Sequence, residues 1–141
     1  MGGHGALLYA TTYPEDVDGI VLLAPFIGGD RASEAIEAAG GLDTWEDCPF
    51  LGWTYGCNLW KSLQVYVSDP SNQKKVVLGF GREDRFADQC RVLGDVLLPE
   101  QVFTVPGEHD WVTWKKLFIK AADYFLELKI QRERQSESRP K

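Results

Sequence analysis

Apolar residues gather in three short blocks along the chain, each bounded by glycine, proline or charge. The blocks cover residues 19–25, 75–81 and 101–107, and aliphatic and β-branched side chains dominate them. A continuous apolar run of this length indicates a strand that is covered on both faces, not one with a solvated face. We therefore expect three buried strands.

Helical periodicity occupies the intervals between these blocks. A glycine-rich opening at residues 2–10 becomes an apolar helical run that must end before Pro14, because the residue before a proline disfavours helical geometry. The order of strand, helix, strand and helix predicts right-handed crossovers and an α/β fold, with about three parallel strands and helices on both faces. Three further helices are expected where apolar residues recur at steps of three and four: Leu59, Trp60, Leu63, Tyr66 and Val67; Phe86, Cys90, Leu93 and Leu97; and Trp114, Phe118, Ala121, Phe125 and Leu128.

Two segments depart from this regular pattern. Residues 26–73 have no single period, and their stretch from 43 to 58 is rich in tryptophan, glycine and cysteine. We expect an irregular insertion there, which serves either as a lid or pocket wall or as a plain surface loop. Residues 129–141 are charged and poor in apolar side chains, so they are predicted to be a disordered tail. One domain over residues 1–128 follows.

Composition excludes several classes of function. The net charge of −6 argues against binding to nucleic acid, because such binding depends on lysine and arginine side chains. No apolar run approaches the ~18 residues of a membrane span, and the opening residues do not resemble a signal peptide, so we expect a cytoplasmic protein, with a signal upstream of Met1 as the alternative. No Cys-x-x-Cys pair or metal-ligand spacing is present, and no metal or cofactor is expected. Cys48 and Cys57 are either a small disulfide loop or two thiols.

Ionisable residues follow the second and third predicted strands. Asp84 comes shortly after the second, and His109 comes shortly after the third. Because the carboxyl ends of parallel strands meet at one edge of the sheet, these side chains are expected to lie close together. An imidazole oriented by a carboxylate can take a proton from a nucleophile and return it to a leaving group. A histidine at a strand end also serves often as an ordinary hydrogen-bonded loop residue.

Two motifs resemble those of a known family. The opening Met1-Gly2-Gly3-His4-Gly5-Ala6-Leu7 resembles the stretch after the nucleophile in esterase-type α/β-hydrolases, whose elbow reads G-x-S-M-G-G-x-G-A-L. Residues 107–111, Gly-Glu-His-Asp-Trp, followed by Trp114, are similar to the histidine loop of the small carboxylesterases of that family. The resemblance covers Met1 to about Leu128. It implies the C-terminal part of an α/β-hydrolase, with Asp84 and His109 as triad members and Met1 and Gly2 as the remnant of the elbow and oxyanion site.

The resemblance places the nucleophilic serine one residue before Met1. None of the serines in the chain stands in a Gly-x-Ser-x-Gly setting. We therefore expect a fragment of an ester hydrolase that is inactive alone, whose partner is the N-terminal half of the same fold. The implied substrate is a small ester or thioester.

Several alternatives stay open at this point. Glu83 is a second choice for the acid, while Glu108 and Asp110 compete for that role but adjoin His109 in the chain. His4 is expected to pack behind the site, without a catalytic role. A non-catalytic binding or interaction module is the rival function. A metal site on His109 and Asp110 would offer too few ligands.

Overall fold

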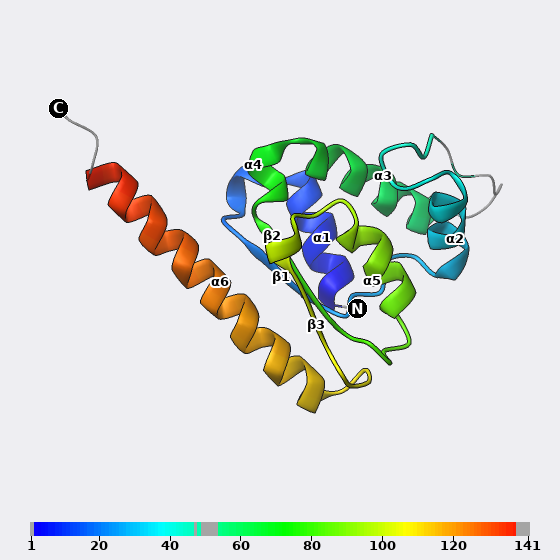
Figure 1. The fold of residues 1–141 in the computed structure, drawn as a ribbon. Coiled ribbons are helices and arrows are strands. Elements are labelled where there is room, and N and C mark those ends of the chain that lie inside the picture. The colour runs from blue at the N-terminus through cyan, green and yellow to red at the C-terminus, as the bar shows by residue number, and fades with distance from the viewer. Residues whose placement is uncertain (1, 47, 49–53, 138–141) are drawn as a thin grey trace.

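The computed structural model describes residues 2–46, 48 and 54–137 (Figure 1). These residues form one three-stranded parallel sheet with helices on both faces, so the predicted α/β class is confirmed. The strands are β1 (Ile20–Leu23), β2 (Val76–Gly81) and β3 (Val102–Val105), and the helices are α1 (Gly2–Thr12), α2 (Asp30–Ala38), α3 (Thr54–Ser68), α4 (Pro70–Gln73), α5 (Ala87–Gly94) and α6 (Trp111–Glu137), with 3₁₀ turns η1 (Pro14–Asp16) and η2 (Pro99–Gln101).

The strand order β1-β2-β3 places β2 at the centre, and all six of its residues are buried. Its neighbour β1 pairs with β2 alone among the described residues, so β1 is an edge strand. The backbone N–H groups of Ile20 and Ala24 donate toward the β2 side, to Lys75 and Gly79. Since successive residues of a strand direct their backbone groups to opposite sides, those of Val21 and Leu23 face away from the sheet.

Helix α6 covers one face of the sheet, and α1 and α5 cover the other (Figure 1). The close approach of α6 depends on Gly79 in β2, because an added Cβ there would lie only 3.1 Å from the Cβ of Leu117. Leu117 and Ala121 are buried in this contact. Phe118, one of the apolar residues that recur at helical spacing in this helix, is 56% exposed. Seating Leu117 over Gly79 rotates the next residue of the helix outward.

The segment 26–73 is mostly helical. It contains α2, α3 and α4, so the predicted irregular insertion is not confirmed. Of its stretch from 43 to 58, residues 47 and 49–53 lie outside the described part of the chain. Helix α3 packs outside α1. A disulfide joins Cys48 to Cys57, so of the two alternatives for these cysteines the structure has the small disulfide loop. The apolar positions predicted for α3 are all buried: Leu59, Trp60, Leu63, Tyr66 and Val67.

The charged tail differs from its prediction. Helix α6 continues to Glu137 where disorder was expected from Lys129, and residues 138–141 lie outside the described part of the chain. A helix already nucleated on the sheet needs no new nucleus to extend, and Lys129 and Glu133 are spaced as an i,i+4 pair of opposite charge. No helix within the described residues is long and apolar enough to cross a membrane.

Candidate active site

Asp84 and His109 meet at the carboxyl ends of β2 and β3. The Nδ1 atom of His109 lies 2.9 Å from Oδ2 of Asp84 and 3.0 Å from Oδ1. The Asp84 side chain is fully buried, whereas that of His109 is 22% exposed. The carboxylate thus occupies one ring nitrogen, and Nε2 is the nitrogen that can exchange a proton with a third group.

A tight turn after β2 holds the Asp84 carboxylate in place. The backbone N–H of Phe86 donates to Oδ1 of Asp84 at 2.9 Å, a turn closed by a side chain that aspartate adopts readily. The backbone N–H of Ala87 donates to the Asp84 carbonyl at 2.9 Å, where α5 begins. Asp84 therefore has its backbone fixed by the start of a helix and its carboxylate fixed by a second donor.

His109 lies between a glycine turn and the start of α6. Gly107 has a φ of +143°, a conformation that favours glycine. Asp110 accepts a hydrogen bond from the backbone N–H of Thr113 at 2.8 Å, which caps the helix. This hydrogen bond, together with that from the Thr113 side chain, lowers the pKa of Asp110 below its usual range. Asp110, a competitor for the acid role, is therefore engaged in capping α6.

Two aromatic rings contact the imidazole of His109. Phe86 and Trp114 both meet His109 edge-on, with ring centroids 5.0 Å and 4.7 Å away. Phe26, from the loop after β1, contacts Phe86 in turn at 5.4 Å and is partly exposed. The rim of the sheet therefore carries an apolar wall beside the acid–imidazole pair.

The remaining acidic candidates lie apart from the histidine ring. Glu83 directs its carboxylate to the backbone N–H of Gly107 at 2.6 Å, so it is engaged with the histidine loop and not with the imidazole. Glu108 is exposed. The structure thus brings Asp84, and neither of these two residues, to the His109 ring.

The elbow residues are only partly described. Met1 lies outside the described residues, and Gly2 is the exposed first residue of α1. His4 is buried in the same helix, as its predicted packing role requires. In the loop after β2, Arg85 lies over the Phe86 ring at 4.9 Å. Asp88 pairs with Arg91 within α5.

Sequence reasoning missed the support of the loop after β1. Ala24 has a φ of +45°, a rare conformation for a residue with a side chain, and the chain turns sharply there. The buried side chain of Gln89 accepts a hydrogen bond from the backbone N–H of Ile27 at 2.9 Å and donates to Asp30 at 3.0 Å. A glutamine adjoining Cys90 on the apolar face of α5 was the signal that could have revealed this anchor.

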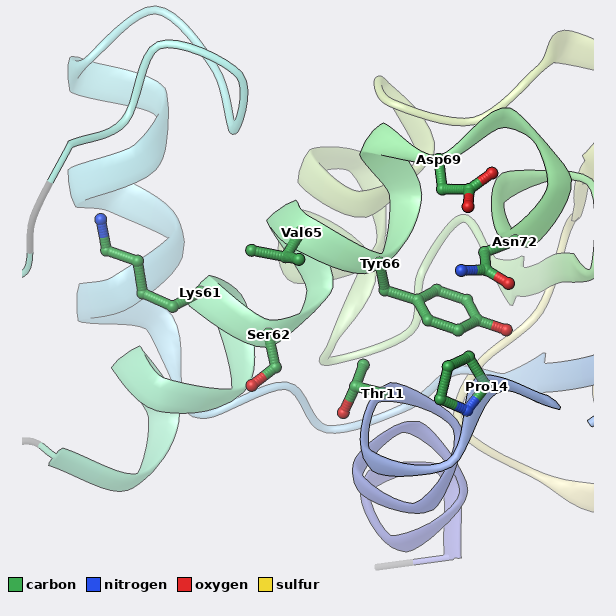
Figure 2. A pocket seen from close by; sticks show the side chains of 8 residues that line it. All are labelled: Thr11, Pro14, Lys61, Ser62, Val65, Tyr66, Asp69 and Asn72. Atoms are coloured by element: carbon green, nitrogen blue, oxygen red, sulfur yellow. The ribbon is translucent and has the colours of Figure 1, made fainter. Parts of the chain in front are cut away.

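His109 does not line either of two hollows in the surface of the described residues. One, of about 430 Å³, is wholly apolar and lies between Leu23 of β1 and the Trp111 to Ile119 part of α6. Figure 2 shows another, of about 500 Å³, between α1, α3 and α4. The second adjoins η1 and α4, which precede β1 and β2, so it lies toward the amino ends of the strands and away from the Asp84–His109 pair. Its lining residues are Thr11, Pro14, Lys61, Ser62, Val65, Tyr66, Asp69 and Asn72.

The described residues contain no cluster of side chains suited to bind a metal ion. No group of three or more histidine, cysteine, aspartate or glutamate side chains that could hold a metal ion is found among the described residues.

Burial raises the pKa of the Cys90 thiol far above its usual range, which keeps this cysteine protonated and unsuited to act as a nucleophile.

Comparison with known proteins adds no relative to this picture. No family model, curated protein or solved structure matches the chain. What is established is therefore the three-stranded parallel α/β fold and the contact between a buried carboxylate and an imidazole at its rim.

Proposed function

We propose that this chain carries the acid and the base of a serine ester hydrolase of the α/β-hydrolase type. The observation that supports the proposal is the 2.9 Å contact between the buried Asp84 carboxylate and Nδ1 of His109 at the carboxyl edge of a parallel sheet. Loops at that edge are where α/β proteins place their reactive groups. The nucleophilic serine would come from a segment outside this sequence, the N-terminal half of the same fold.

In this mechanism each proton has a defined place. Nε2 of His109 accepts the proton of the serine hydroxyl as its oxygen attacks the ester carbonyl. The imidazolium then gives that proton to the departing alcohol, and an acyl-serine ester is left. Water attacks the acyl-serine by the same route, giving the carboxylic acid and restoring the serine. Asp84 holds the Nδ1–H tautomer throughout and stabilises the imidazolium. No cofactor takes part in these steps, and small esters or thioesters are the proposed substrates.

The test begins with the reading frame upstream of Met1. A Gly-x-Ser immediately before Met1 is expected, and the extended protein should be labelled by a fluorophosphonate probe and should hydrolyse p-nitrophenyl acetate. His109→Ala should lower this rate by on the order of 10⁶-fold, the loss seen when the triad histidine of a serine hydrolase is removed. His4→Ala is the matched control and should keep most of the activity.

The rival is a non-catalytic binding module on the same scaffold, favoured by the lack of a Gly-x-Ser-x-Gly segment in this chain. An extended protein that resists the fluorophosphonate probe while folding normally would establish the rival and refute the hydrolase.

A cytoplasmic location belongs to the same proposal, and the structure contains one feature that opposes it. Disulfides such as Cys48–Cys57 are typical of oxidising compartments and rare in the cytosol. Counting free thiols by mass spectrometry on protein taken from its own cells tests this: three alkylated cysteines place the protein in a reducing compartment, and one places it in an oxidising compartment.

A further inference from the structure

The loops that carry Asp84 and His109 are joined to each other directly beyond the sheet. The backbone N–H of Arg82 donates to the Val105 carbonyl at 2.9 Å, and the backbone N–H of Glu83 donates to the Gly107 carbonyl at 3.2 Å. The pairing of β2 with β3 therefore continues past the last residues of both strands. The relative position of the acid and the histidine depends on this continuation.

Glu83 makes a second contact with the same glycine. Its carboxylate Oε2 accepts the backbone N–H of Gly107 at 2.6 Å, a charge-assisted hydrogen bond. Both the N–H and the carbonyl of Gly107 are thus held by one residue, once through the side chain and once through the backbone. A short chain of two bonds ties the histidine loop to the acid loop.

Gly107 is the residue of the histidine loop at which a restraint affects the position of His109. With a φ of +143° it occupies a conformation in which glycine has wide freedom, and it lies two residues before His109. A rotation at this glycine would move the imidazole relative to Asp84. The other end of the histidine loop is already fixed by the Asp110 cap of α6. Glu83 supplies the missing restraint on the strand side.

We propose that Glu83 is a positioning residue, which holds the His109 imidazole in register with Asp84 through Gly107. The inference rests on the proposed function for its catalytic meaning, but its geometry can be measured without catalysis. Two adjacent acids divide the task between them: Asp84 contacts the ring, and Glu83 contacts the backbone of the loop that carries the ring. Glu83 is exposed, whereas the Asp84 side chain is buried.

The test reads the histidine ring itself. Long-range ¹H–¹⁵N spectra of the ¹⁵N-labelled chain, recorded at a pH high enough for the imidazole to be neutral, report which ring nitrogen carries the proton. The wild type is expected to hold the Nδ1–H tautomer, because Asp84 accepts from Nδ1. Glu83→Ala should lose that preference and shift toward the mixture seen for a solvated histidine. Its Gly107 amide should also exchange with solvent faster, on the order of tenfold, as expected for the loss of one hydrogen bond.

Two further variants test whether the effect of Glu83→Ala comes from the lost hydrogen bond or from the lost charge. Glu83→Gln keeps an acceptor oxygen and should restore the Nδ1–H tautomer. Glu108→Ala removes an equal charge from the exposed neighbour of His109 and should change neither readout. Nδ1–H occupancy in Glu83→Ala equal to that of the wild type would overturn the proposal, as would a wild type already at the solvated mixture. Neither result concerns the serine, so the labelling experiment above can succeed where this one fails.

Discussion

The loops that carry Asp84 and His109 approach each other so closely that a single added methyl group should force them apart. An added Cβ at Gly81, the last residue of β2, would lie 2.0 Å from the carbonyl oxygen of Gly107. Ordinary contact begins at 3.4 Å, so the loops must separate by about 1.4 Å. That displacement disrupts the bond between Glu83 and Gly107 and draws His109 out of reach of Asp84. Steric strain of this kind costs ~1–3 kcal/mol and each lost hydrogen bond about 1 kcal/mol. We expect Gly81→Ala to lower the free energy of unfolding by about 3 kcal/mol.

Urea unfolding followed by circular dichroism measures this loss, and the tautomer of His109 reports the local effect. Gly94→Ala at the end of α5 is the matched control, because its new Cβ would lie 3.5 Å from Val102, in ordinary contact. Alanine is the better helix former, so the control should gain up to ~1 kcal/mol. A Gly81→Ala protein as stable as the control, with the Nδ1–H tautomer intact, would refute the reasoning.

Four further outcomes are expected. Gln89→Leu leaves the buried N–H of Ile27 without its acceptor and should cost about 2 kcal/mol in urea unfolding; an unchanged midpoint would contradict the anchor. The Cys90 thiol, whose pKa is raised by burial, should resist iodoacetamide in the native protein and react only after unfolding. Because the folded-state pKa of Asp110 is lowered, its contribution to stability is present above the usual aspartate pKa and is lost as pH falls through the folded value, so Asp110→Asn should weaken the acid dependence of unfolding. The open edge of β1 should make the chain associate as its concentration rises, and a monomer at every concentration in size-exclusion chromatography would contradict this.

The strands and the acid–histidine pair were predictable because their signals are local and strong. A strand covered on both faces of a parallel sheet must be apolar throughout, and the predicted burial is confirmed for β2. In β3 only Val105 is buried and Thr104 is exposed, so the apolar block located this strand correctly but the prediction that it is buried was wrong. Parallel order then brings the ends of β2 and β3 to one edge, which places Asp84 near His109. The contact at 2.9 Å follows from topology more than from any property of the two residues alone.

Other features depend on contacts that the sequence does not display. The choice of Leu117 over Phe118 for the buried face of α6 is made by a glycine about forty residues earlier in the chain, Gly79. The role of Glu83 is likewise set by a partner, Gly107, that only the loop geometry brings near. The sequence favoured Asp84 among the acids near His109, and the coordinates bring that residue to the ring while Glu83 contacts the backbone of Gly107.

The carboxyl end of β1 lies beside α6, the helix that follows the histidine loop. Leu23, the last residue of β1, lines an apolar hollow together with Trp114, and Trp114 meets the His109 ring. Any backbone that hydrogen-bonds to the outward groups of Val21 and Leu23 would extend toward that hollow. A strand added there would cover the hollow beside Trp114, so assembly would change the surroundings of a ring that contacts His109.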